Sequence, residues 1–319
     1  MFGGGEVTVR VLQNGILRAE VMPGLGGSIL SVNHLKSGLS VLGRVPWDPL
    51  PLPEPSGASP DEASWLARFG GGWPVMFPNA GDACRDGTTT HGFHGEGSVT
   101  PWAARTEGEV LVLTRRFFAV PVTMTRRLRL IGDRLEVTEQ IVADAACSVI
   151  WGQHVTFGSD LLAGPVTLTT SALRLAACAS YDPPANPLIP GSQGDWPHLP
   201  SPRGLEDLSN PPEGAAALAC LCDLGPAPWA EVRRVDGSLA VRLSWTADPW
   251  PLAWLWIETG GTMDAPWFGR GRMIGIEPCS TWPATGLAAA RAAGGQVIAL
   301  TAGEVRTAHI ALTVYRPNS

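Results

Sequence analysis

Two histidines and a carboxylate lie in the polar segment His91-Gly-Phe-His94-Gly-Glu96 of this chain. On an extended backbone, side chains two residues apart share a face, so His94 and Glu96 would point one way and His91 the other. Such groups can bind a polar ligand, a proton or a metal ion. For either histidine taken alone, a satisfied surface or turn position is the simpler interpretation.

A third histidine, His154, follows the apolar run Cys147–Ile150 in the segment Trp151-Gly-Gln-His-Val-Thr-Phe157. A histidine at the end of a strand and beside aromatic rings can have a shifted pKa and transfer protons near neutral pH. The alternative is a buried, hydrogen-bonded histidine at the end of a sandwich, which is the more common role of an isolated histidine.

Glu277 ends the apolar run that starts at Met273 and stands directly before Pro278. A glutamate in that place is either exposed at the turn, which is the default, or held inside a pocket. Inside a pocket, desolvation would raise its pKa toward the value that suits a general base.

The same residues leave a metal site open as an alternative. His91, His94, Glu96 and His154 offer the nitrogen and oxygen ligands that zinc accepts, which would suit a metal-dependent isomerase or lyase. No HExxH or His-x-His pattern occurs. The cysteines form no CxxC pair, and we predict that all six are reduced thiols: Cys84, Cys147, Cys178, Cys220, Cys222 and Cys279.

The elements that must position these residues read as strands. The 38 glycines and 29 prolines divide the 319 residues into short apolar runs, which is typical of an all-β chain. Thr123–Ile131 and Arg134–Val142 flank a Gly-Asp turn and predict a hairpin. Helices are predicted only at 60–68 and 288–293. Further strands are predicted at 6–12, 110–118, 166–175, 216–222, 231–235, 239–245, 252–257, 273–277, 296–300 and 305–314.

We therefore predict one all-β domain over residues 1–319, built as a large antiparallel β-sandwich or a closed barrel. Residues 46–60 and 181–212 are rich in proline and glycine and predict long loops. These loops are either solvent-exposed insertions or the walls of a cleft.

Charge and composition exclude several classes of function. The formal net charge is −6, with 23 basic against 29 acidic residues, so neither nucleic acid nor an anionic membrane is expected as a partner. No apolar run is long enough to span a bilayer, the N-terminus does not resemble a signal peptide, and we predict a cytoplasmic protein. Lys36 is the only lysine, which leaves one candidate for Schiff-base chemistry.

Four segments, taken in order, resemble the aldose 1-epimerase (galactose mutarotase-like) family. They are Gly71–Asp82, His94–Trp102, Trp151–Gly158 and Gly275–Leu287, and the runs 21–29 and 302–314 add to the likeness. The resemblance implies the galactose mutarotase-like supersandwich, a large antiparallel β-sandwich with few short helices. It implies interconversion of the α and β anomers of a sugar by acid–base opening and closure of the ring, with no cofactor.

The resemblance also implies roles for individual residues. Glu277 would be the base, His154 the acid, and His94 a sugar ligand, with His91 as the second choice. Further candidates for substrate binding are Asn79, Arg85, Asp248 and the stacking residues Trp73, Trp151, Trp256 and Trp282. The expected partner is a small sugar, and the chain would be a monomer or a homodimer.

Two departures from the family pattern bear on the substrate. Many members carry an arginine just after the Pro-Asn pair, but here Ala80 and Gly81 follow Asn79. The family's sugar-binding aspartate has no clear match, and Asp248 is chosen over Asp236 and Asp264. A non-catalytic carbohydrate-binding or sugar-sensing protein on the same fold is therefore the alternative. A phosphorylated sugar would need clustered arginines, for which Arg68, Arg85, Arg270 and Arg272 are candidates.

Overall fold

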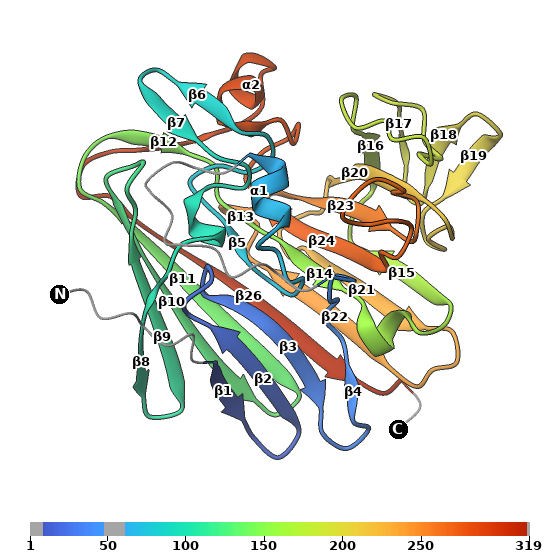
Figure 1. Ribbon diagram of the computed structural model, residues 1–319, viewed down its shortest axis with the longest axis horizontal. Helices are drawn as coiled ribbons and strands as arrows, with labels where there is room; N and C mark the ends of the chain where they lie inside the picture. The colour runs from blue at the N-terminus through green and yellow to red at the C-terminus, as the bar shows by residue number, and fades with distance from the viewer. Residues whose placement is uncertain (1–8, 48–60, 318–319) are drawn as a thin grey trace.

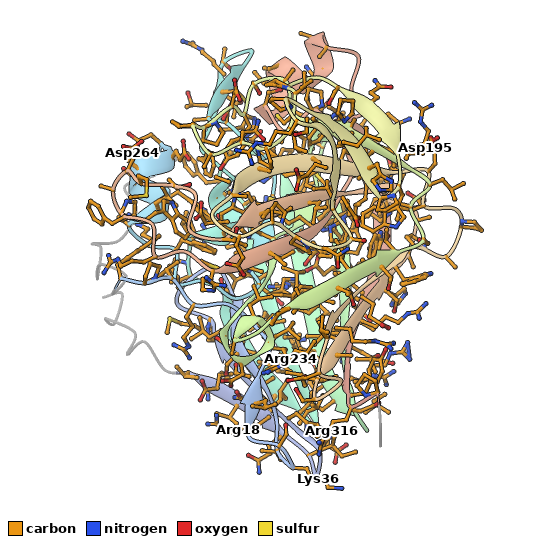
Figure 2. The ribbon with its side chains drawn as sticks, turned by 90° about the vertical axis from the view of Figure 1, so that its right-hand side faces the viewer. Arg18, Lys36, Asp195, Arg234, Asp264 and Arg316 are labelled. Atoms are coloured by element: carbon orange, nitrogen blue, oxygen red, sulfur yellow. The ribbon has the colours of Figure 1, made fainter. Side chains whose placement is uncertain are left out.

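The computed structural model describes residues 9–47 and 61–317. Most of its regular structure is antiparallel strand, and its large sheets pack against one another (Figure 1), which confirms the predicted all-β sandwich. The exposed Lys36, Asp195 and Asp264 mark three separate extremities of the molecule in Figure 2. In the described part, no helix is long and apolar enough to cross a bilayer.

The first large sheet has eight strands and is called the long sheet here. In spatial order its strands are β15 (Val166–Thr170), β21 (Trp229–Arg234), β22 (Ala240–Trp245), β26 (Val305–Tyr315), β11 (Arg134–Ala143), β10 (Val122–Ile131), β9 (Val110–Arg116) and β8 (Ala103–Glu107). The predicted hairpin forms its centre, and Leu128 of β10 lies opposite Val137 of β11 with both side chains buried. Gly132 in the turn has a φ of 58°, which favours glycine.

The second large sheet carries two of the three candidate catalytic segments. Its strands are β17 (Gln193–Asp195), β16 (Arg174–Ala177), β20 (Ala216–Cys222), β23 (Leu252–Glu258), β24 (Met273–Cys279), β13 (Gly152–Gln153) and β5 (Val75–Met76), and β14 (Val155–Phe157) also pairs with β24. Both faces of β24 are buried, since all seven of its residues are buried. Its first polar side chain, Glu277, is therefore held inside the protein.

The remaining elements are smaller. A four-stranded sheet contains β1 (Arg10–Gln13), β2 (Leu17–Met22), β3 (Ser28–His34) and β4 (Leu39–Ser40), and its buried side chains join the same core as both large sheets. Three strand pairs are β6 (Cys84–Asp86) with β7 (Thr89–His91), β12 (Cys147–Val149) with β25 (Ile298–Leu300), and β18 (His198–Ser201) with β19 (Gly204–Asp207). The helices are α1 (Glu62–Leu66), α2 (Gly286–Ala292) and the 3-10 turns η1 (Glu96–Ser98) and η2 (Ser159–Leu162).

A buried polar network ties the two large sheets together. Arg126 and Glu139 face each other across β10 and β11 without solvent exposure, and Arg126 Nε lies 2.7 Å from Glu139 Oε1. Glu139 Oε2 accepts hydrogen bonds from Trp151 Nε1 at 2.7 Å and from Gln153 Nε2 at 2.8 Å. Trp73 Nε1 in turn donates to Gln153 Oε1 at 2.8 Å. Gln153 of β13 and Trp151 just before it both donate to Glu139 of β11. These hydrogen bonds hold β13 against the long sheet.

Some predicted elements differ in detail. The run 166–175, expected as one strand, divides into β15 and β16, which belong to different sheets. The segment 181–212, expected as a loop, contains the short strands β17, β18 and β19. Of the first predicted strand, 6–12, residues 6–8 lie outside the described residues and the rest contributes to β1 from Arg10; most of the predicted loop 46–60 also lies outside the described residues. All six cysteines are free thiols, as predicted.

Candidate active site

The structure brings His94, His154 and Glu277 together from three separate segments. His154 Nε2 lies 3.7 Å from Glu277 Oε1, and the rings of His94 and His154 have centroids 5.1 Å apart. His154 stands between β13 and β14, and Glu277 lies on β24, with which β14 pairs. The three residues are only 7%, 5% and 2% exposed, so this group, called the His–Glu site here, is almost fully buried.

Hydrogen bonds to the backbone of Gly81 hold the loop that carries His94. His94 has a φ of 55°, in the left-handed region that is unusual for residues other than glycine. Its backbone N–H donates to Gly81 O at 3.0 Å, and Gly81 N–H donates to His94 Nδ1 at 3.1 Å. Nδ1 is thus an acceptor, so a neutral His94 carries its proton on Nε2, where it can donate to a ligand.

Asn79, expected to bind substrate, instead holds this loop. Its Nδ2 donates to Asp82 O at 2.9 Å and Gly92 O at 2.8 Å, and its Oδ1 accepts from Leu287 N at 2.7 Å. The side chain is fully buried, and these backbone bonds use its amide group. Asn79 therefore positions the segment before His94 rather than pointing at a ligand.

Aromatic rings cover the His–Glu site. Trp65 of α1 and Phe69 just after it lie with ring centroids 5.5 Å and 5.2 Å from His154, and Trp65 is 4.8 Å from His94. Phe93 and Trp256 pack on the same histidines, at 4.1 Å from His94 and 5.9 Å from His154 respectively. Sequence reasoning missed both Trp65, which lies in the predicted helix 60–68, and Phe69, which follows it; in the structure their rings stack with centroids 4.5 Å apart.

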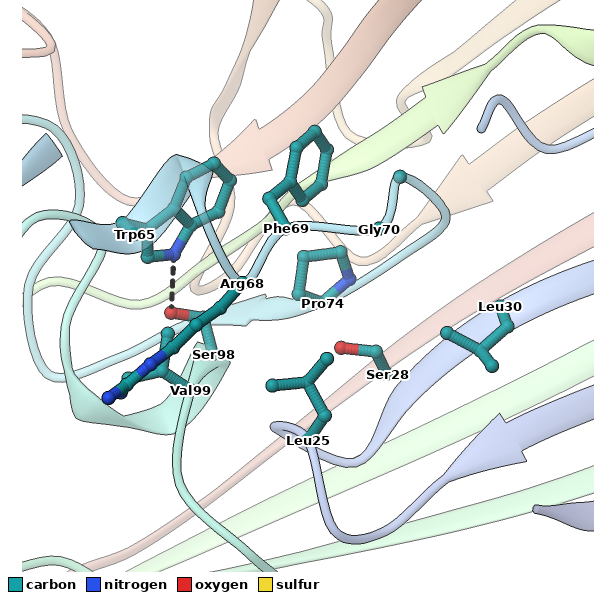
Figure 3. Close-up of a pocket in the computed structure, with 11 residues that line it drawn as sticks. Leu25, Ser28, Leu30, Trp65, Arg68, Phe69, Gly70, Pro74, Ser98 and Val99 are labelled. Atoms are coloured by element: carbon teal, nitrogen blue, oxygen red, sulfur yellow. Dashed lines mark hydrogen bonds between the residues drawn. The ribbon is translucent and has the colours of Figure 1, made fainter. Parts of the chain in front are cut away.

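Figure 3 shows a small cavity beside these rings. It has a volume of about 10 Å³ and is lined by Trp65, Phe69, Ser98 and their neighbours, which is room for one water molecule at most. Trp65 Nε1 donates to Ser98 Oγ at 2.9 Å and so anchors the cover. Trp65 and Phe69 thus pack against the histidines on one side, and the cavity beside them is too small for a sugar.

Burial sets the protonation of the His–Glu site. It raises the pKa of the Glu277 carboxyl well above its ordinary range and lowers the pKa of His154 to about 4. Burial, with the nearby His154, also holds the pKa of His94 well below its ordinary value. At neutral pH both histidines are therefore neutral, and burial favours the protonated form of Glu277. A protonated Glu277 beside a neutral His154 is a pair with one transferable proton, which is what general acid–base chemistry requires.

These pKa directions predict a pH-dependent stability. Because the pKa of His154 falls from 6.5 to about 4 on folding, its contribution is complete above pH 6.5 and is lost as the pH falls toward 4. The loss is on the order of 3 kcal/mol. In urea unfolding followed by tryptophan fluorescence, His154→Gln is expected to flatten this acid decline. Equal slopes for both proteins between pH 6.5 and 4 would contradict the assignment.

Gly275 makes room for the Glu277 carboxyl. A Cβ at Gly275 would lie 2.3 Å from Glu277 Oε1 and 3.2 Å from Trp256 Cβ. Gly275→Ala is therefore expected to displace the carboxyl and to slow any reaction that uses it by about 10²-fold, the usual effect of a misplacement near 1 Å. Gly15→Ala, where a Cβ meets nothing within 4 Å, is the matched control. An unchanged turnover in Gly275→Ala would show that this carboxyl is not used.

The structure leaves the other candidate residues outside this group. Arg85 is exposed on the β6–β7 hairpin, and Asp248 is exposed in the turn between β22 and β23. The Trp151 ring is in the core network. His91 is buried on β7, where burial lowers its pKa, and its Nδ1 has no hydrogen-bond partner in the described part.

Glu96, one of the four proposed metal ligands, has a different role. Its Oε1 accepts hydrogen bonds from the backbone N–H groups of Phe118 and Ala119, each at 2.7 Å. Residues 9–47 and 61–317 contain no group of three or more His, Cys, Asp or Glu side chains placed to hold a metal ion.

Comparisons with solved structures give the fold. The chain superposes on the Slr1438 protein from Synechocystis sp. PCC 6803 with a TM-score of 0.67 and 15% identity, covering 99% of this chain and 98% of that one. A galactose mutarotase-like protein from Lactobacillus casei ATCC 334 gives 0.64 and 14%, covering 97% and 100%. A galactose mutarotase related enzyme from Lactobacillus acidophilus gives 0.63 and 16%, covering 97% and 98%.

This chain has the galactose mutarotase-like fold. No family model and no curated protein matches its sequence. The galactose mutarotase-like fold extends over nearly the whole chain, which confirms the fold implied by the sequence motifs. Because a fold at this identity does not fix an activity, the function must be argued from the His–Glu site itself.

Proposed function

We propose that the chain is a sugar mutarotase of the aldose 1-epimerase type. The observation that carries this proposal is the approach of His154 Nε2 to Glu277 Oε1, at 3.7 Å, beside His94 in a buried, aromatic-lined site. Anomer exchange needs one group that gives a proton to the ring oxygen of a hemiacetal and another that takes the proton of its hydroxyl. This pair supplies both.

The proposed reaction assigns the base to Glu277 and the acid to His154. The ionised Glu277 removes the proton of the anomeric hydroxyl as the protonated His154 gives a proton to the ring oxygen, and the bond between C1 and the ring oxygen breaks. Rotation about the C1–C2 bond exposes the other carbonyl face. Ring closure returns each proton by the reverse path and gives the other anomer.

The protonation of the closed site fits one stage of this cycle. A protonated Glu277 beside a neutral His154 is the state in which the pair stands after ring opening. Binding of a hemiacetal would replace aromatic contacts by sugar hydroxyls, and a more polar site favours the ionised carboxylate. His94, with its proton on Nε2, would donate to a sugar oxygen near C1. Trp256, half-buried beside His154, would pack on an apolar face of the ring.

The decisive experiment measures exchange between α and β anomers by saturation-transfer NMR at low buffer concentration. The panel contains free aldoses and hexose phosphates. Acceleration of exchange for at least one sugar is expected. If the folded protein accelerates none of them, it is not a mutarotase for these sugars.

A sugar-binding protein without turnover is the second candidate. The aromatic packing favours it, since Trp65 and Phe69 lie against the histidines that a sugar would have to reach. Saturable binding of a sugar without any acceleration of anomer exchange would establish this function in place of the first.

A further inference from the structure

Three arginines from separate segments line one hollow on the surface. Arg44 follows β4, while Arg270 and Arg272 lie just before β24. Ser159, Leu162 and Ala163, in and after η2, complete the lining of a hollow of about 420 Å³. The lining contains no acidic residue, although the whole chain has a net charge of −6. This three-arginine hollow is therefore a positively charged region on a protein with a negative net charge.

The three positive charges are only partly neutralised. Arg272 binds the exposed Glu213 at 2.7 Å, and Arg44 lies 3.9 Å from Glu20. In the described part Arg270 has no carboxylate partner. Its Nε and Nη2 donate to Trp267 O and Pro266 O at 3.5 Å, and its guanidinium lies 5.6 Å from the ring of Phe268. Exposed ion pairs such as those of Arg44 and Arg272 are weak and exchange readily for another anion.

The three-arginine hollow is separate from the His–Glu site. Arg272 and Glu277 are five residues apart along extended chain, which is about 16 Å. None of the residues that line the hollow belongs to the His–Glu site. Arg44 pairs with Gly71, at the base of the segment that carries Trp65 and Phe69. Arg44 thus links the hollow to the chain segment that carries Trp65 and Phe69.

We propose that the three-arginine hollow binds a phosphate group. The planar guanidinium matches two phosphate oxygens at once, and three such groups around one space supply up to three positive charges to a dianion. The volume of about 420 Å³ lies within the range of small-molecule sites and exceeds the needs of a bare phosphate. The ligand is thus inorganic phosphate or a small phosphate ester, with the ester favoured by size.

Calorimetric titration at constant ionic strength tests this proposal with three probes: inorganic phosphate, glucose 6-phosphate and glucose. The proteins are the wild type, Arg270→Gln, the double variant Arg270→Gln/Arg272→Gln, and Arg116→Gln. Arg116 is the matched control, since it is 70% exposed and paired with Asp144 at 2.8 Å away from the hollow.

Both phosphate probes are expected to bind the wild type and the Arg116→Gln variant equally well. Arg270→Gln should weaken their binding about tenfold, and the double variant should weaken it further. Tighter binding of glucose 6-phosphate than of inorganic phosphate identifies an ester as the ligand, and equal binding identifies free phosphate. Undiminished binding to the double variant, or an equal loss in Arg116→Gln, overturns the proposal.

The proposal is independent of the mutarotase activity. Glu277→Gln, which alters only the His–Glu site, is expected to bind both phosphate probes with wild-type affinity. Loss of phosphate binding in Glu277→Gln would place the phosphate at the His–Glu site and would also overturn the three-arginine hollow as its site.

Discussion

Replacing Glu277 by glutamine is expected to slow anomer exchange by about 10²–10⁴-fold, the usual effect of removing a general base. Glutamine keeps the shape of the side chain but cannot accept the anomeric proton. Saturation-transfer NMR on the sugar that the wild type accelerates gives the rate. Glu109→Gln, an exposed glutamate outside the His–Glu site, is the control and should exchange at the wild-type rate. Full activity in Glu277→Gln would remove Glu277 from the mechanism.

The same variant is expected to gain stability at neutral pH. Burial raises the pKa of Glu277 in the folded chain, so its contribution to the free energy of unfolding is complete below its ordinary pKa of 4.5 and declines as the pH rises above it. Glutamine has no such decline. The Glu277→Gln protein should therefore be more stable relative to wild type at pH 7 than at pH 4, as measured by urea unfolding, so a loss of activity would not reflect unfolding.

Replacing His154 by glutamine is the second large effect expected, again about 10²–10⁴-fold in the rate of anomer exchange. Glutamine places an amide near the position of Nε2, the atom 3.7 Å from Glu277, but it cannot donate a proton to the ring oxygen. The measurement is the same NMR exchange at pH 7. If His154→Gln retains the wild-type rate, the acid is His94 or water and not His154.

The double variant Glu277→Gln/His154→Gln separates a catalytic pair from two independent contributions. When two residues act as a unit, replacing either one lowers the rate about as much as replacing both. The double variant should therefore be little slower than either single variant. Rates that fall as the product of the two single effects would show that the two residues do not share one proton-transfer cycle.

The parts of the structure that could be predicted are those set by residues close together in the sequence. Alternation of polar and apolar residues in β10 and β11, with a Gly-Asp turn between them, is sufficient to define the hairpin and its buried face. The motifs around His94, His154 and Glu277 predicted which residues would meet, and the structure places their side chains together. Spacing alone could not have done so, because these residues are separated by long stretches of chain.

The candidates that lay outside the recognisable motifs were placed less well. Arg85 is the arginine nearest to Asn79 in the sequence, and Asp248 is one of three aspartates that could match the family's; both are exposed and outside the His–Glu site. Trp151 has the right type for sugar stacking, but its indole N–H is bound to the buried Glu139. Residue type states what a side chain can do, whereas its partners decide what remains free to do it.

The sequence by itself determined the all-β class, the order of the strands along the chain and the identity of His94, His154 and Glu277 as candidates. Only the tertiary structure decided that Trp65 and Phe69 pack on this group, that burial raises the pKa of Glu277, and that Arg44 joins Arg270 and Arg272 around one hollow. The physical reason is range. Strand periodicity and turn geometry are set by neighbouring residues, whereas desolvation and charge clustering depend on segments far apart in the chain that meet when the sheets pack.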